Sequence, residues 1–98
     1  MIAKLVHRGK NVLPDGSVVE MVIWKLPGKN PERQHCIKYR LYYSSWDGSC
    51  IVRYDNESGK GDHRHYGDTE ESYCFVDVET LMADFLEDVA KARGENHD

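Results

Sequence analysis

The segment from Asp77 to Arg93 constrains the fold most, because it carries the clearest helical pattern in the chain. Its apolar side chains recur three and four residues apart, which places them on one face of a helix. They are Val78, Leu81, Met82, Phe85, Leu86, Val89 and Ala90. Asp77 is a typical N-cap, and Gly94 is a typical stop signal. A helix with one apolar stripe has to pack on another layer, which the preceding residues must supply.

The residues before this helix have the composition of β-strands, separated by turn sequences. Segments rich in Val, Ile, Tyr and Trp predict strands at residues 2–8, 17–26, 36–43 and 50–55. Turn sequences at residues 14–17 and 46–49 and a proline-containing loop at 27–31 separate them. Residues 72–76 could add a short strand, whereas residues 56–70 are expected to form a long loop. The sequence therefore predicts an α+β fold, with an antiparallel sheet of four or five strands and one C-terminal helix packed on one face.

The turn between the third and fourth strands sets a register. If Asp47 and Gly48 are the central residues of a type I′ turn, Tyr43 pairs with Val52 and Leu41 pairs with Tyr54. Side chains alternate across a strand, so two faces can be assigned. The face predicted to be core holds Tyr39, Leu41, Tyr43, Val52 and Tyr54, and the opposite polar, cationic face holds Lys38, Arg40, Tyr42, Arg53 and Asp55.

Length and composition favour one soluble domain. The chain has 98 residues, of which 40% are hydrophobic and 31% charged, so we expect a single α+β domain at residues 1–94 and a frayed tail at 95–98. No stretch approaches the roughly 20 apolar residues of a membrane span, and the N-terminus lacks the apolar core of a secretion signal. Three widely spaced cysteines do not form a disulfide scaffold, so a cytoplasmic location is expected.

Charge is unevenly distributed along the chain, although the net charge is only −4. Residues 25–66 carry 8 basic and 5 acidic side chains, whereas residues 67–98 carry 2 basic and 10 acidic ones. A local cationic region can bind phosphates whatever the total charge. The middle of the chain is therefore the candidate region for contact with a nucleic acid.

The segment Gly59-Lys60-Gly61-Asp62-His63-Arg64-His65 concentrates groups that suit RNA cleavage. That reaction needs a base, an acid and cations around the phosphate, and histidine and arginine supply these functions. The predicted catalytic residues are His63, His65, Asp62 and Arg53, and the predicted substrate-binding residues are Arg40, Lys60, Arg64, Tyr42 and Lys38. Asp55 or Asp62 is expected to orient a histidine, and Asn56 to cap the loop. Asp55 and Asn56 are thus assigned structural roles.

Other interpretations of this segment remain open. It could be a solvated loop whose histidines have no function, or a metal site in which Asp62, His63 and His65 are joined by Cys50, Cys74 or His35. The spacing matches no standard zinc module, so neither a metal nor another cofactor is predicted. A non-enzymatic module could also use the cationic sheet face to inhibit a host target or to bind a partner subunit. In that case the histidines would be replaceable.

Several segments carry a family resemblance. They are residues 18–27, residues 38–43 (Lys-Tyr-Arg-Leu-Tyr-Tyr), residues 53–56 (Arg-Tyr-Asp-Asn), residues 59–65 and residues 85–89. With them the chain resembles the TumE family of small toxins from prokaryotic toxin–antitoxin pairs. The resemblance implies a helix-turn-helix antitoxin encoded nearby. Together with the residue chemistry, it predicts the toxin of a type II pair, a small metal-free ribonuclease whose partners are RNA and that antitoxin. An exposed strand edge would allow a homodimer.

Overall fold

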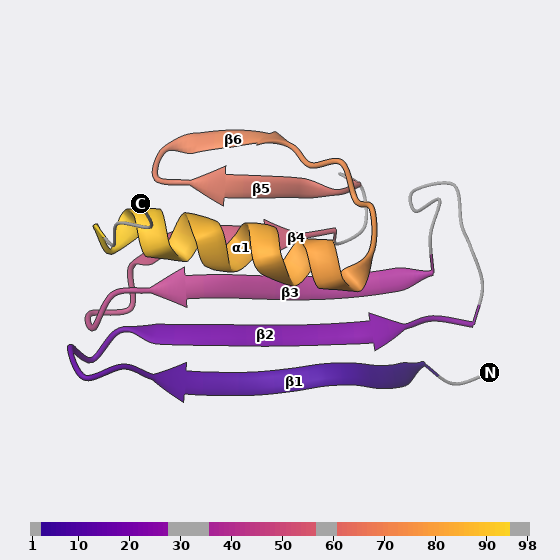
Figure 1. Cartoon of the computed structure of the whole chain (residues 1–98), viewed down its shortest axis with the longest axis horizontal. Coiled ribbons are helices and arrows are strands. Elements are labelled where there is room, and N and C mark those ends of the chain that lie inside the picture. The colour runs from indigo at the N-terminus through magenta and orange to yellow at the C-terminus, as the bar shows by residue number, and fades with distance from the viewer. Residues whose placement is uncertain (1–2, 28–35, 57–60, 95–98) are drawn as a thin grey trace.

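The computed structural model describes residues 3–27, 36–56 and 61–94. It has the predicted α+β architecture, a sheet with one C-terminal helix on one face (Figure 1). The elements are β1 (Lys4–Val12), β2 (Val18–Lys25), β3 (Ile37–Ser44), β4 (Cys50–Asp55), β5 (His63–Tyr66), β6 (Thr69–Ser72) and α1 (Val78–Ala92). Each strand pairs antiparallel with the next one along the chain, so the six strands form a meander. The expected tail, residues 95–98, lies outside the described residues.

The helix begins and ends where the sequence predicts. The Asp77 side chain accepts a hydrogen bond from the Thr80 backbone N–H at 2.7 Å, as an N-cap does. Gly94 follows the C-cap with φ +74°, a left-handed conformation that glycine adopts without steric cost. Helix α1 packs on β4 and β3, and Leu81 and Phe85 are fully buried there. The apolar stripe thus meets the sheet face that the alternation of side chains assigns to the core.

The core confirms the predicted alternation of β3 and β4. All five side chains assigned to that face are buried: Tyr39, Leu41, Tyr43, Val52 and Tyr54. Tyr43 pairs with Val52 and Leu41 with Tyr54, as predicted. Because the side-chain period of a strand is two, a register shifted by one residue would have put the opposite set inside.

The turn between β3 and β4 is not the predicted type I′ turn. That type needs a positive φ at both central residues, but of Asp47 and Gly48 only Gly48 has one, at +88°. The Gly48 N–H donates to the Ser45 carbonyl at 3.0 Å, and the register shifts between Tyr43 and Ser44. A longer loop and a β-bulge therefore replace the two-residue turn. The predicted pairs survive because the bulge absorbs the extra residue.

Residues 63–72 form a hairpin, so the prediction of a long loop at 56–70 is wrong in this part. Strands β5 and β6 raise the sheet to six strands, one more than the upper limit predicted. Tyr66 pairs with Thr69, and Gly67 takes φ +60° in the two-residue turn between them. The hairpin has no apolar period because polar cross-strand pairs hold it together, including a 3.0 Å contact between Arg64 and Glu71.

Residues 73–76 are not in the short strand that the sequence suggested for 72–76, since β6 ends at Ser72. Instead, aromatic side chains from this segment pack on the core. The Tyr73 ring meets the Tyr54 ring edge-on with centroids 5.0 Å apart, and Phe75 stacks on Tyr39 at 5.9 Å. The segment thus leads the chain from the sheet edge onto the face that α1 covers.

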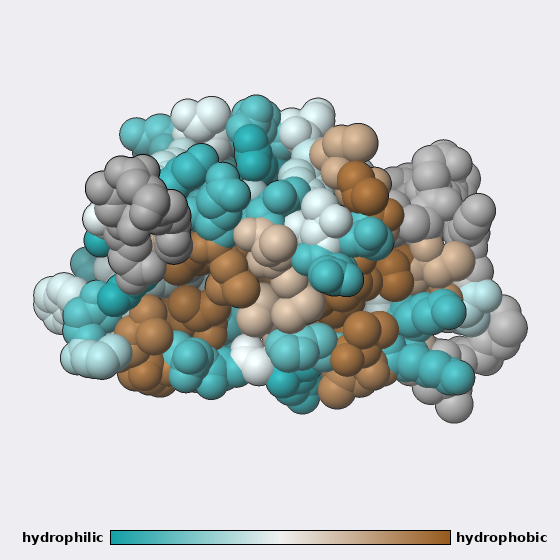
Figure 2. Space-filling model, in the orientation of Figure 1, coloured by the Kyte–Doolittle hydropathy of each residue, from teal (hydrophilic) through white to brown (hydrophobic). Residues whose placement is uncertain are grey.

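Strand β1 is longer than predicted, since it runs to Val12 instead of ending at Arg8. It pairs along its length with β2, with an irregularity between Leu5 and His7. A groove of about 630 Å³ lies between these two strands and α1. Figure 2 shows hydrophobic side chains on this side of the molecule, over β1 and β2. Within the described ranges, the one helix is too short and too polar to cross a membrane.

Buried tyrosines make the stability of the fold sensitive to alkaline pH. Burial raises the pKa of Tyr39, Tyr54 and Tyr73, and hydrogen bonds to Asp62, Asp88 and Asp84 raise it further. The folded protein therefore keeps these protons at a pH where the unfolded chain, with a tyrosine pKa of about 10, loses them.

We expect these three tyrosines to leave the free energy of unfolding unchanged below about pH 10 and to lower it above that pH. Each tyrosine contributes a slope of up to about 1.4 kcal/mol per pH unit. Urea unfolding between pH 8 and 11 measures this. The Tyr39→Phe variant keeps the ring and removes one titrating group, so its slope should be shallower. An equal slope in both proteins would contradict the prediction for Tyr39.

Candidate functional site

The site lies on the sheet face opposite α1. Tyr54 faces the helix, because its hydroxyl donates to Asp88 Oδ2 of α1 at 2.5 Å, and its β5 partner Arg64 shares that face. Alternation then turns the neighbouring side chains of β4 and β5 to the other face. The set that gathers there is called the histidine cluster: Arg53, Asp55, His63, His65 and Glu70. It combines three adjacent strands, β4, β5 and β6.

His63 is held between two oxygens. Its Nε2 lies 2.7 Å from Asp55 Oδ1, and its Nδ1 lies 3.1 Å from the Gly61 carbonyl oxygen. Only 8% of its side chain is exposed. The approach to Asp55 is close but not aligned as a hydrogen bond, since Asp55 Oδ1 is buried and accepts none from the described residues. His63 and Asp55 therefore lie in close contact, and Asp55 Oδ1 can still accept a hydrogen bond.

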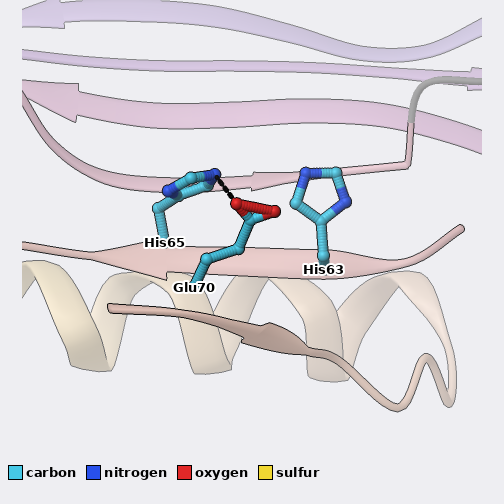
Figure 3. A group of neighbouring side chains, drawn as sticks. All are labelled: His63, His65 and Glu70. Carbon is cyan, nitrogen blue, oxygen red and sulfur yellow. Dashed lines mark ion pairs between the residues drawn. The ribbon is translucent and has the colours of Figure 1, made fainter. Parts of the chain in front are cut away.

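His65 is more exposed and is contacted from two sides at one nitrogen. Its Nε2 lies 3.0 Å from Arg53 Nη2 and 3.1 Å from Glu70 Oε2. A protonated Nε2 can donate to Glu70, whereas an unprotonated one can accept from Arg53, so the two bonds cannot be made at once. In Figure 3 the Glu70 carboxylate lies between the two imidazole rings. The position of one proton thus decides which partner binds His65.

Arg53 contacts His65 directly and also contacts Asp55, the residue beside His63. Its Nε lies 3.3 Å from Asp55 Oδ2, and its Nη2 reaches His65. The Nε atom is itself buried without a hydrogen bond to the described residues. The guanidinium therefore lies beside the two imidazole rings with one N–H group that makes no hydrogen bond to the described residues. The centroids of those rings are 5.8 Å apart.

Three of the other predicted binding residues lie on the same face, on β3. Arg40 pairs with Asp55 and Tyr42 pairs with Arg53 across the strands, and alternation places Lys38 beside them. The Arg40 guanidinium lies over the Tyr42 ring, 5.1 Å from its centroid. The Tyr42 hydroxyl donates to Glu20 at 2.5 Å, a bond that raises the pKa of Tyr42. The cationic face predicted from the hairpin register therefore continues into the histidine cluster.

Comparison with known protein families places this chain. A family model described as toxin TumE matches residues 2–93. The chain belongs to the TumE toxin family. No curated protein and no solved structure matches it. The match spans all the described strands and the helix, so the histidine cluster lies within the part of the chain that defines TumE membership.

Two residues predicted for the site, Arg64 and Asp62, have partners outside the cluster in this member of the TumE family. Arg64 lies on the helix-covered face, where it donates to the Tyr54 hydroxyl at 3.0 Å and contacts α1. Asp62 accepts a hydrogen bond from the Tyr39 hydroxyl at 2.6 Å, so of the two carboxylates expected to orient a histidine it is Asp55 that lies beside one. Lys60 lies outside the described residues.

Asn56 has a structural position at the end of β4. Its Oδ1 accepts from the Tyr39 N–H at 3.0 Å and its Nδ2 donates to the Ile37 carbonyl at 2.7 Å. The side chain thus satisfies two backbone groups at the start of β3. Because Asn56 follows Asp55 directly, these bonds also hold the carboxylate that contacts His63.

Sequence reasoning missed Glu70. The signal was the dipeptide Gly67-Asp68, since glycine at the first central position favours a type II′ hairpin turn. Reading that turn would have paired His65 with Glu70, as the structure does. The absence of an apolar period on either side of the turn hid the hairpin.

Proposed function

We propose that this TumE-family protein is the toxin of a type II toxin–antitoxin pair and that it is a small ribonuclease using metal-free histidine acid–base catalysis. The observation that supports it best is the pairing of His63 and His65 on one sheet face. A guanidinium contacts one ring, and cationic side chains continue along the neighbouring strand. The family supports the toxin part, and the cluster chemistry supports the ribonuclease part.

The proposed reaction breaks the bond between phosphorus and the 5′-oxygen of RNA. A base removes the proton of the 2′-hydroxyl, and the 2′-oxygen attacks phosphorus. An acid gives a proton to the departing 5′-oxygen, which leaves a 2′,3′-cyclic phosphate. One histidine in each protonation state suffices for both transfers, and a properly placed acid or base typically contributes about 10²–10⁴-fold to the rate.

Exposure suggests how the work is divided. We assign His65 to the contact with substrate, because 27% of its side chain is exposed against 8% for His63. His63 supplies the second transfer from the deeper position beside Asp55. Arg53 and Arg40 are assigned to the phosphate, because guanidinium groups form paired hydrogen bonds with it. The Tyr42 ring is assigned to stack on a base.

The substrate-binding role extends to Lys38 at the end of the same face, as a phosphate contact. We keep Lys60 as a further phosphate contact on the sequence argument alone. Arg64 and Asp62 instead receive structural roles. The Arg64 guanidinium is already engaged by Tyr54, a bond that raises its pKa, and by the acidic groups of β6 and α1.

The family implies an antitoxin as partner, and we propose that it is a helix-turn-helix protein. Two surfaces could receive it. Its acidic segment would cover Arg40 and Arg53, or its basic surface would meet the acidic side of α1. Among the described strands, β1 and β6 are the two edges of the sheet, and an edge strand would also allow a homodimer.

The test is incubation of the purified protein with a mixed RNA pool, with and without EDTA. We expect cleavage that EDTA leaves unchanged, with products ending in cyclic phosphate. Cleavage abolished by EDTA would contradict the metal-free mechanism. A protein that cleaves no RNA, free or on ribosomes, would contradict the ribonuclease proposal and favour a binding module that acts through its cationic face.

A further inference from the structure

We propose that His63, His65 and Glu70 form a binding site for one divalent transition-metal ion of the Zn²⁺ type. We further propose that the bound ion inhibits the protein, and this second part rests on the proposed function. An ion would occupy the nitrogen lone pairs that acid–base catalysis needs. The cluster would then be either a metal site or a proton-transfer site at any moment.

The geometry of the three side chains suits an ion. One ligand atom from each residue can be chosen so that all of them lie within 4.8 Å of one another (Figure 3). A tetrahedral Zn²⁺ site has ligands about 2.0–2.2 Å from the ion, so its ligand atoms lie about 3.4 Å from one another. Side-chain rotations that bring these atoms closer together would close the site. His65 and Glu70 are partly exposed, which leaves a route for an ion to enter.

The Asp55 carboxylate provides an independent indication of a ligand. Its Oδ1 is buried, lies 2.7 Å from His63 Nε2 and accepts no hydrogen bond from the described residues. Buried carboxylate oxygens are normally satisfied, and an unsatisfied one calls for an explanation. A cation held by His63, His65 and Glu70 would bring positive charge close to this oxygen.

The ligand types select the class of ion. Imidazole nitrogens suit Zn²⁺, Co²⁺ and Ni²⁺, whereas Mg²⁺ and Ca²⁺ prefer oxygen ligands alone. The three candidate ligands come from β5 and β6, which are neighbouring strands with a fixed register. The backbone therefore places the ligands before any ion arrives, which lowers the entropy lost on binding.

Arg53 opposes the ion. Its Nη2 lies 3.0 Å from His65 Nε2, the nitrogen that also faces Glu70, so guanidinium and metal would compete for one position. A guanidinium and a metal ion that share one contact atom are close enough to repel each other. Moving the Arg53 side chain away would also break its 3.3 Å contact with Asp55 Oδ2, so the guanidinium opposes the ion as long as it stays in place. Removing this guanidinium should therefore strengthen metal binding, although the same change is expected to weaken binding of a phosphate.

The experiment is a titration of chelator-treated protein with Zn²⁺ against a metallochromic indicator. We expect one ion per chain, at least tenfold weaker binding in His65→Ala and in Glu70→Gln, and tighter binding in Arg53→Gln. The control is His7→Ala on β1, which should bind like the wild type. Equal affinity in His65→Ala, Glu70→Gln and the wild type would overturn the site.

Co²⁺ spectra separate this site from one built on cysteines. Ligands of nitrogen and oxygen give visible bands without the near-ultraviolet band of a bond between cobalt and thiolate. A thiolate band would overturn the proposal in favour of a site at Cys50 or Cys74, both exposed. The binding titration does not depend on any activity, so it decides the metal site even if the protein cleaves no RNA. Zn²⁺ that binds at the cluster and leaves RNA cleavage unchanged would overturn the inhibitory role alone.

Discussion

The His65→Ala variant is expected to cleave RNA about 10²–10⁴-fold more slowly than the wild type, the contribution typical of a placed acid or base. The fold should be retained, because His65 lies on the sheet face opposite α1 and 27% of its side chain is exposed. Single-turnover cleavage of a short labelled RNA in EDTA measures the effect. Thermal unfolding of the same sample shows whether the variant is folded.

His7→Ala is the matched control for this prediction. His7 is also a strand histidine, but it lies on β1, which three strands separate from β5 in the sheet order. It should cleave RNA at the wild-type rate. His63→Gln should also lose activity, and it keeps a polar side chain beside the buried Asp55. A His65→Ala protein that cleaves RNA as fast as the wild type would eliminate the proposed catalytic role.

The Phe85→Ala variant is expected to lose about 3–5 kcal/mol of unfolding free energy, as large-to-small substitutions in cores do. Phe85 is fully buried, and its ring lies edge-on to Tyr54 with centroids 5.7 Å apart. The side chain anchors α1 to the sheet, and its removal would leave a cavity in the core. Since small domains have only about 5–15 kcal/mol in total, the variant should unfold at a clearly lower urea concentration.

Leu86→Ala provides the comparison for Phe85→Ala. It is the next residue of the same helix, but it is largely exposed beside the groove between α1 and β1–β2. It should cost less than about 1 kcal/mol, because little buried area is lost. Equal losses in the two variants would show that helix propensity, and not packing on the sheet, determines the effect.

The parts of the fold with strong local signals were predictable from the sequence. Helix α1 follows from apolar spacing and from its caps, and both are properties of residues near one another in the chain. The β3–β4 register also follows from local pattern. One apolar face must be buried, so Tyr43 pairs with Val52 even though the turn type predicted from Asp47-Gly48 is wrong.

The candidate site was predictable only in part. Histidine chemistry and the cationic face of β3 and β4 pointed to His63, His65 and Arg53 from residue types alone. The pairing of His63 with Asp55 and of His65 with Glu70 needed the β5–β6 hairpin, which has no apolar face to announce it. By residue type Arg64 was as good a candidate for the site as its neighbours. Strand alternation places its side chain on the face of α1.

The amino-acid sequence by itself determined helix α1, the first four strands, and which chemical groups stand close together along the chain. The tertiary structure alone decided which of those groups share a face. For a polar strand, neither face is selected by burial of its own side chains. The direction in which His63, Arg64 and His65 point is therefore set by hydrogen bonding to β4, whose own apolar face is held against α1.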